Sequence, residues 1–323
     1  MASTLDYKEV KEATYLAIEY KNLEAIRGLI KSNVYAATDA LDCEKGVKFF
    51  SEKAKETNMV MPELYFFIRR PISEKYRKIF RRLARESIIK TALKISSRGI
   101  RGYQKKIIPY YHIGMPEFDI DATIQHNPLK IHSKTLTYDD IYGIKRKRQK
   151  RNIVLILDTS GSMYGRLLLN AALTTSVLAY HMEREHFSIV LFNSTAMTLK
   201  GIKEEKSTIK IVDDILDSEA AGFTNISIGL EKGLKQLEKV KQSRNKNKFG
   251  ILISDGNYNR GEDPIEFAKK FSTLHVIGMP AENDAERGID TCRELAKVGK
   301  GKFYAVNDYK EIPRALINLL SQA

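Results

Sequence analysis

The feature that most constrains the fold is a continuous apolar run, Ile-Val-Leu-Ile-Leu, at residues 153–157. A strand that is apolar on both faces is typical of the buried centre of a parallel sheet. Further strands are predicted at 187–192, 196–199, 249–253, 274–278 and 302–305, with helices at about 165–183 and on either side of Gly222. Strands that alternate with helices predict an α/β fold with a doubly wound, mostly parallel sheet over residues 151–323.

Residues 1–105 are predicted to form a helical N-terminal region. Apolar residues recur there at spacings of three and four, first in a series over residues 10–23 that continues to residue 30. Asn33 is a stop signal for this series, and Thr38 or Asp39 can cap the next helix. Stripes of this kind usually pack into a core, so we assign them no function.

A long basic helix is predicted to follow Ser73, its expected N-cap, and to end near Gly99 and Gly102. Residues 67–108 hold fourteen Lys and Arg against two Glu, a net charge of +12 within a chain of net charge +14. A second cluster at 145–151 adds six bases. We expect the basic helix, around Arg77, Arg81, Arg82 and Arg85, to contact an acidic partner surface or nucleic acid, although a solvated basic face is equally consistent.

Residues 106–150 are predicted to be an extended, β-rich connector. Pro109, Pro116 and Pro128 interrupt short runs in this segment, where the helical spacing fades. Residues 118–124 alternate apolar and polar side chains, which is a strand signature. The sequence therefore predicts three parts, at 1–105, 106–150 and 151–323.

Hard oxygen donors follow three elements of the predicted sheet. Asp158, Ser160 and Ser162 come directly after the first strand, Thr224 precedes a helix, and Asp255 follows the strand at 249–253. In open parallel sheets, ligands bind beyond the carboxyl ends of the strands, where these loops are expected to meet. Three hydroxyls and two carboxylates suit Mg²⁺ or Mn²⁺ and do not suit zinc.

This pattern resembles the metal-ion-dependent adhesion site (MIDAS) of von Willebrand factor A (VWA) domains. Asp158, Ser160 and Ser162 look like the family's DxSxS motif, Thr224 like its downstream threonine, and Asp255 like its later aspartate. The resemblance covers about residues 151–320. It implies that the hydroxyls bind the ion directly, that the carboxylates act largely through water or from behind, and that an open position accepts a partner's Glu or Asp.

A shorter resemblance lies upstream. Residues 118–124 and Asn127 look like the segment that precedes the VWA domain in partners of MoxR-type AAA+ ATPases and in the D subunit of magnesium chelatase. Together the two resemblances imply an adaptor that grips an acidic residue on a partner protein, with such an ATPase or its client as the partner. Ro-type proteins, which join helical repeats to a VWA domain, imply RNA binding as the alternative, but no repeat is visible here.

Three observations bear on enzymatic activity and cellular location. Haloacid-dehalogenase phosphatases also begin with a strand-end aspartate, but they have a second one where this chain has Ser160. No phosphate-binding G-x-x-x-x-G-K-[ST] loop occurs, so we expect a binding protein with no catalytic residues. The two cysteines lie far apart, and there is no secretory signal or long apolar segment, which together predict a cytoplasmic protein with no membrane span.

Overall fold

The computed structural model describes residues 6–55, 60–96, 104–108, 117–147, 151–161, 166–181, 186–218, 222–240, 248–279, 285–306, 311, 314–316 and 318–319. The chain forms two compact units. Met1–Gly99 and Arg151–Leu319 make up the first, and Ile100–Lys150 with Leu320–Ala323 the second. The division at residues 105 and 150 stays a prediction.

A six-stranded sheet forms the centre of the first unit. Its strands are β3 (Asn152–Asp158), β4 (His186–Phe192), β5 (Ala196–Lys200), β6 (Lys248–Ser254), β7 (Leu274–Gly278) and β8 (Lys300–Ala305). They lie in the order β5-β4-β3-β6-β7-β8, and every pairing is parallel except that of β5 with β4. All seven residues of β3 are buried, as expected for a central strand. The prediction of a doubly wound, mostly parallel sheet is confirmed.

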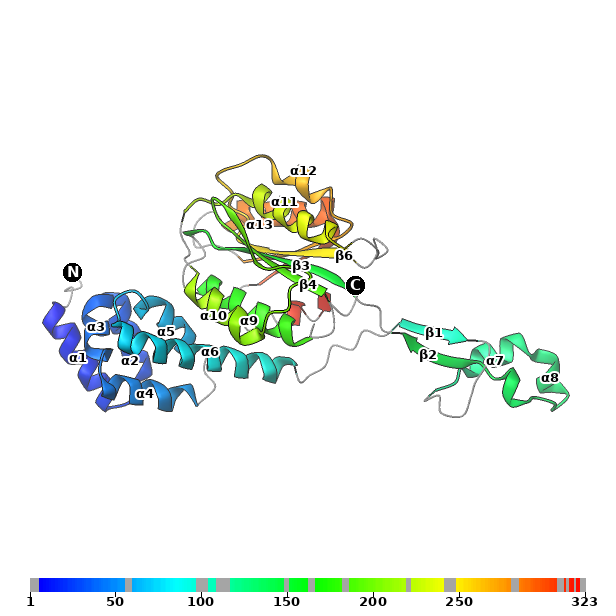
Figure 1. Ribbon diagram of the computed structural model, residues 1–323, viewed down its shortest axis with the longest axis horizontal. Coiled ribbons are helices and arrows are strands. Elements are labelled where there is room, and N and C mark those ends of the chain that lie inside the picture. Colours follow the sequence, from blue (N-terminus) through cyan, green and yellow to red (C-terminus); the bar gives the residue numbers. More distant parts are fainter. Residues whose placement is uncertain are drawn as a thin grey trace. The chain divides into compact units, whose positions relative to one another are not determined.

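Helices cover both faces of this sheet (Figure 1). One face carries α9 (Arg166–His181) and α10 (Thr208–Asp217), and the other carries α11 (Ile226–Glu238), α12 (Pro264–Ala268) and α13 (Ala285–Val298). Two glycines let α11 approach the sheet closely. A Cβ on Gly229 would lie 2.6 Å from the Phe192 ring, and one on Gly233 would lie 2.6 Å from Ile156 Cδ1. This packing brings the start of α11 to the same edge as the end of β3.

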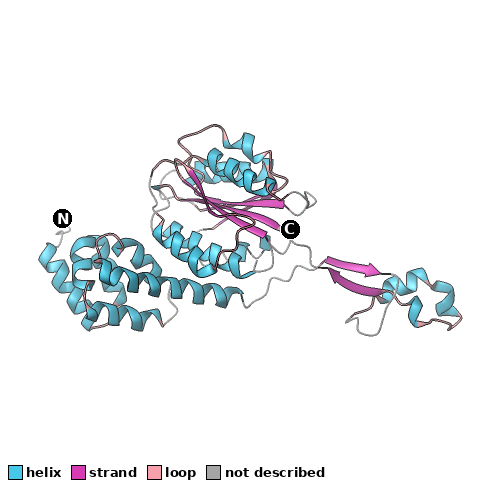
Figure 2. Cartoon of the chain, in the orientation of Figure 1, coloured by secondary structure: helices cyan, strands magenta, loops and turns pink. Residues whose placement is uncertain are grey.

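The N-terminal region is helical, as predicted (Figure 2). Its helices are α1 (Tyr7–Glu19), α2 (Leu23–Ser32), α3 (Val34–Leu41), α4 (Glu44–Ala54), α5 (Val60–Ile68) and α6 (Glu74–Ser96). Phe50, Phe66 and Phe80 are among its largest fully buried side chains, and the rings of Phe50 and Phe80 pack edge to face. Helix α6 begins directly after Ser73, as predicted, whereas Gly99 and Gly102 lie outside the described residues.

Two details of the N-terminal prediction are wrong. The apolar series does not form one continuous stripe, because Lys21 adopts a positive φ of 53° between α1 and α2 and leaves Tyr20 79% exposed. The cap of α3 is Asn33, whose side chain accepts a hydrogen bond from the Ala36 N–H. Thr38 and Asp39 lie inside that helix. One asparagine therefore ends α2 and starts α3, a double role that stop and start rules do not anticipate.

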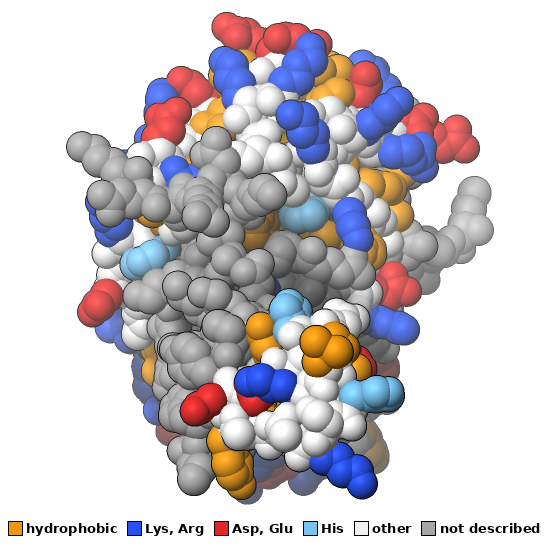
Figure 3. Space-filling model, turned by 90° about the vertical axis from the view of Figure 1, so that its right-hand side faces the viewer, with side chains coloured by type: hydrophobic (Ala, Val, Ile, Leu, Met, Phe, Trp, Pro, Cys, Tyr) orange, Lys and Arg blue, Asp and Glu red, His pale blue; other side chains and the backbone are white. Residues whose placement is uncertain are grey.

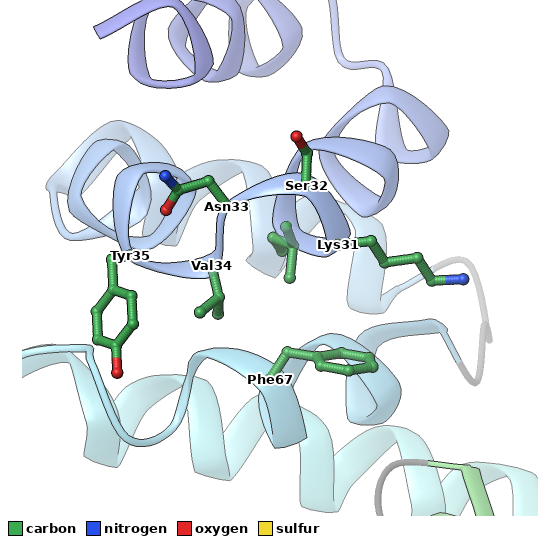
Figure 4. A pocket seen from close by; sticks show the side chains of 7 residues that line it. Lys31, Ser32, Asn33, Val34, Tyr35 and Phe67 are labelled. Atoms are coloured by element: carbon green, nitrogen blue, oxygen red, sulfur yellow. The ribbon is translucent and has the colours of Figure 1, made fainter. Parts of the chain in front are cut away.

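A pocket opens beside this turn. Its lining comes from the end of α2, the start of α3 and the α5 residue Phe67. Figure 4 shows Val34 and Tyr35 projecting toward the element that carries Phe67. The pocket is made by helix packing, and no charged carboxylate or histidine lines it, so we assign it no chemistry.

The basic helix α6 finds acidic partners within the chain. Arg85 pairs with Asp213 at 2.7 Å, and Arg81 contacts both Asp213 and Asp217, at 3.3 and 2.9 Å. Both aspartates belong to α10, which covers the sheet. For these two arginines, the acidic contacts therefore come from the protein itself, and a contact of the basic helix with an acidic partner or nucleic acid stays a prediction.

The second unit differs from its prediction in one element. An antiparallel ribbon forms between β1 (Gln104–Ile108) and β2 (Gly143–Lys147), as a β-rich connector requires. The alternating segment at 118–124, however, is not a strand. Phe118 makes one isolated bridge to Gly143, and then α7 (Ile120–His126), α8 (Pro128–His132) and a 3₁₀ turn (Tyr138–Asp140) follow.

Hydrophobic side chains remain exposed in this second unit. Leu129 is 83% exposed and Tyr138 67%, and Ile120 and Ile124 are each about half exposed. Figure 3 shows orange hydrophobic side chains interspersed with charged ones on the face turned to the viewer. Within the residues that the structure describes, no helix is both long and apolar enough to cross a membrane.

Candidate metal site

Four of the five predicted site residues lie together at the carboxyl edge of the sheet. Asp158 is the last residue of β3 and Ser160 follows it, Thr224 precedes α11, and Asp255 follows β6. Since β3 and β6 are parallel neighbours, their ends meet at one edge. Asp158 and Asp255 are fully buried, and the two hydroxyl residues are nearly so. The fifth predicted ligand, Ser162, lies outside the described residues.

Asp158 is fixed by donors from two loops. Its Oδ1 accepts a hydrogen bond from the Ser160 N–H at 2.9 Å, and its Oδ2 accepts one from the Ser254 hydroxyl at 2.6 Å. Burial, and then the nearby charge of Asp255, raise the pKa of the Asp158 carboxyl to about 6. Two carboxylates held this close without a cation repel each other.

The threonine loop is tied to both of its neighbours. The Gly161 N–H donates to the Gly222 carbonyl at 3.2 Å, which joins the serine loop to the threonine loop. Thr224 donates its N–H to Asn259 Oδ1 at 2.9 Å, and its carbonyl accepts from the N–H groups of Asn259 and Arg260. Gly222 has a φ of +86°, a conformation that glycine adopts without strain. The three loops therefore form one hydrogen-bonded rim.

Asp255 has one carboxylate oxygen that no described residue donates to. Its Oδ1 accepts from the Asn257 N–H at 3.0 Å, but its Oδ2 is buried and accepts no hydrogen bond from the described residues. A buried carboxylate oxygen without a donor is costly, and a cation would satisfy it. The described residues contain no group of three or more His, Cys, Asp or Glu that could hold a metal, so an ion here depends on hydroxyl ligands. The residues present fit a hard cation with oxygen ligands.

Two features of the rim were missed from the sequence. The predicted ligand set does not include Ser254, yet its hydroxyl donates to Asp158 and accepts a hydrogen bond from the Gly256 N–H. Asn259 holds both backbone groups of Thr224. The position of Ser254 at a strand end beside an aspartate was a usable signal, whereas the pairing of Asn259 with Thr224 depends on the fold.

Comparison with known proteins agrees with this architecture. The von Willebrand factor type A domain profile matches residues 152–318. Inter-alpha-trypsin inhibitor heavy chain H3 of Mus musculus is 29% identical over 130 residues, and heavy chain H1 of Bos taurus is 27% identical over 123. Each match covers 36% of this chain and 14% of the relative, so this chain corresponds to a small part of those proteins.

Solved structures of similar fold are more distant in sequence. An aerotolerance-related membrane protein from Bacteroides fragilis is 20% identical, covering 54% of this chain and all of that one, with a TM-score of 0.44. Proximal thread matrix protein 1 from the mussel byssus, solved with a zinc-occupied MIDAS motif, is 21% identical, covering 53% and 47% of the two chains, with a TM-score of 0.41. Domains of this family are generally protein-interaction modules that bind a divalent metal. Because the family profile spans more than half of the chain, the protein belongs to the von Willebrand factor type A domain family.

Proposed function

We propose that this protein is an adaptor that captures partner proteins through a divalent cation, Mg²⁺ or Mn²⁺, at the carboxyl edge of its sheet. Ser160, Ser162 and Thr224 would bind the ion, and Asp158 and Asp255 would support it from behind. The observation that carries the proposal is the buried Asp255 Oδ2, which has no hydrogen-bond donor among the described residues and lies near a second buried carboxylate.

The ligand types explain why such a site favours binding over catalysis. Neutral hydroxyls leave the ion with much of its positive charge, and it can then accept a carboxylate from another protein. No described residue at this edge is a histidine or cysteine placed as a nucleophile or base. Cys292 lies behind the rim, but it is buried, and burial raises the pKa of its thiol well above the usual range, which keeps it unreactive.

The proposed partner is a AAA+ ATPase of the MoxR type, or a client of that ATPase. This part of the proposal is supported by the upstream segment at 118–127, which resembles the corresponding segment of known partners of these ATPases. RNA binding through the basic helix has weaker support, since Arg81 and Arg85 are engaged with Asp213 inside the chain. We also propose that the protein acts in the cytoplasm.

Metal binding and partner capture can be tested on one variant. Thr224→Ala removes a ligand from the rim, and calorimetry with Mg²⁺ or Mn²⁺ should show affinity at least tenfold weaker, about 1.4 kcal/mol. Thr91→Ala is the matched control, because that hydroxyl donates only to the Ser87 carbonyl of its own helix. Unchanged metal affinity in Thr224→Ala, at unchanged thermal stability, would contradict the assignment.

Partner capture is measured on the same proteins. The intact chain, immobilised in native lysate, should retain a AAA+ ATPase in Mg²⁺ and release it with chelator. Thr224→Ala should lose this retention, and Thr91→Ala should keep it. If retention survives both chelation and Thr224→Ala, the ion is structural and the interface lies elsewhere.

A further inference from the structure

A guanidinium lies over an aromatic ring on the rim of the metal site. Phe223 directly precedes Thr224, and its side chain is 49% exposed. The guanidinium carbon of Arg260 lies 4.1 Å from the centre of the Phe223 ring. Arg260 belongs to the loop after β6, so the pair joins two of the three loops that form the site. Neither residue takes part in the ligand set described above.

The backbone holds this pair in a fixed place. The Arg260 N–H donates to the Thr224 carbonyl at 3.2 Å, and the Phe223 N–H donates to the Ser194 hydroxyl at 3.0 Å. The next residue, Gly261, has a φ of +92°, and a Cβ there would lie 2.2 Å from Asn225 Oδ1. The loop therefore packs tightly against the start of α11. The hydrogen bond from the Arg260 N–H to the Thr224 carbonyl fixes the backbone of Arg260 beside Thr224.

Arg260 has no carboxylate partner among the residues that the structure describes. Other arginines do, including Arg27 with Glu63, Arg85 with Asp213 and Arg293 with Asp290. The two acids at the rim, Asp158 and Asp255, are fully buried and oriented by other donors. Stacking on Phe223 covers one face of the guanidinium and leaves its N–H edge available for a bidentate carboxylate.

We propose that Arg260 is a second anchor for the partner, so that the segment captured by this site carries two carboxylates. One carboxylate binds the ion, and the other binds the Arg260 guanidinium, which is stacked on the Phe223 ring. The inference rests on the proposed metal-dependent capture and specifies its ligand, an acidic peptide segment with two nearby Asp or Glu residues. A planar guanidinium beside an electron-poor ion selects paired acids, because each carboxylate meets its own positive group.

The test uses the full chain and labelled Gly-Ser peptides with one glutamate, or with two glutamates at several spacings. Binding is followed by fluorescence anisotropy in Mg²⁺ and in chelator. At the best spacing, the second glutamate should strengthen binding about fivefold or more. Arg260→Gln should abolish this gain and leave the metal-dependent binding of the one-glutamate peptide unchanged, which a merely structural role would not do.

Lys270→Gln is the matched control. Lys270 also lies over an aromatic ring, that of Phe267 at 4.7 Å, but it precedes β7 at the opposite edge of the sheet. This variant should keep the gain. Two outcomes would overturn only the second anchor. In the first, the one-glutamate peptide binds in a metal-dependent way but a second glutamate adds nothing. In the second, the gain from the second glutamate survives Arg260→Gln. If no peptide binds in a metal-dependent way, the proposed capture fails and the inference fails with it.

Discussion

His275 is a buried titratable side chain near the start of β7, away from the carboxyl edge of the sheet. It belongs to β7, its ring packs edge to face on Phe249, and its Nδ1 accepts a hydrogen bond from the Lys302 N–H at 3.0 Å. Its Nε2 is buried and has no hydrogen-bond partner in the part of the chain that the structure describes. Burial, and then the nearby charge of Lys302, lower the pKa of His275 to about 4. The folded protein therefore keeps this imidazole neutral at pH values where an unfolded chain would protonate it.

This shift predicts a pH-dependent stability with a defined sign. Above the unfolded pKa of about 6.5, the contribution of His275 is fully present. As the pH falls from 6.5 toward 4, His275 takes up a proton in the unfolded chain but not in the folded protein. Up to about 3 kcal/mol of the free energy of unfolding is lost over this range. His275→Asn keeps an acceptor for Lys302 but does not titrate.

Urea unfolding from pH 7.5 to pH 4 would measure this effect. The free energy of unfolding of the parent should fall more steeply than that of His275→Asn. Parallel curves for the parent and His275→Asn would contradict the prediction.

At the same residue scale, the sequence predicted which polar residues meet at the carboxyl edge of the sheet better than it predicted the residues around them. Asp158, Ser160, Thr224 and Asp255 could be found because each stands at a fixed place relative to a strand or helix, and strand ends converge in a parallel sheet. The Arg260–Phe223 stack could not be predicted in this way. It depends on how the loop after β6 folds back on Thr224, and loop conformation is not encoded in a periodic pattern.

At the scale of elements, the segment at 118–124 shows how local hydrogen bonds can override alternation. Two-residue periodicity predicted a strand, yet the Asp119 side chain accepts a hydrogen bond from the Ala122 N–H at 2.9 Å and starts α7. The Thr123 hydroxyl donates back to the Asp119 carbonyl at 2.6 Å. A capping aspartate satisfies a backbone donor that an isolated strand would leave to water. Alternation over so few residues does not outweigh this cap.

Removal of the cap should loosen α7. Asp119→Ala is expected to cost about 1 kcal/mol in local stability, because an N-cap hydrogen bond is lost. Hydrogen–deuterium exchange in the full chain should show faster exchange for peptides that cover residues 120–126. Asp119→Asn retains an acceptor and should exchange nearly as slowly as the parent, and Asp121→Ala, a change within the first turn, should have a smaller effect. Equal protection in Asp119→Ala and the parent would show that tertiary contacts, not the cap, hold the helix.

At the scale of the whole molecule, the helical region and the sheet belong to one compact unit, which the sequence did not indicate. The charge pattern predicted an acidic contact for α6 but could not identify α10 as its source. Besides the ion pairs of Arg81 and Arg85, the buried Arg69 donates to the carbonyls of Leu216 and Ser218 at 2.5 and 2.8 Å. These carbonyls lie at the C-terminal end of α10, where they have no partner within the helix. The N-terminal region therefore contacts α10 through ion pairs and through hydrogen bonds to these terminal carbonyls.

A double-mutant cycle can measure this contact. Asp213 is 8% exposed and pairs with Arg85 at 2.7 Å, so water screens the pair less than it screens an open surface pair. Arg85→Gln and Asp213→Asn, alone and together, should give a coupling free energy of about 1–2 kcal/mol in urea unfolding of the full chain. The exposed pair Glu74–Lys78, at 4.0 Å on the same helix, should give about 0.5 kcal/mol or less. A coupling for Arg85 and Asp213 no larger than that of Glu74 and Lys78 would mean that this ion pair contributes little, and that the packing of α6 on α9 and the hydrogen bonds of Arg69 join the helical region to the sheet.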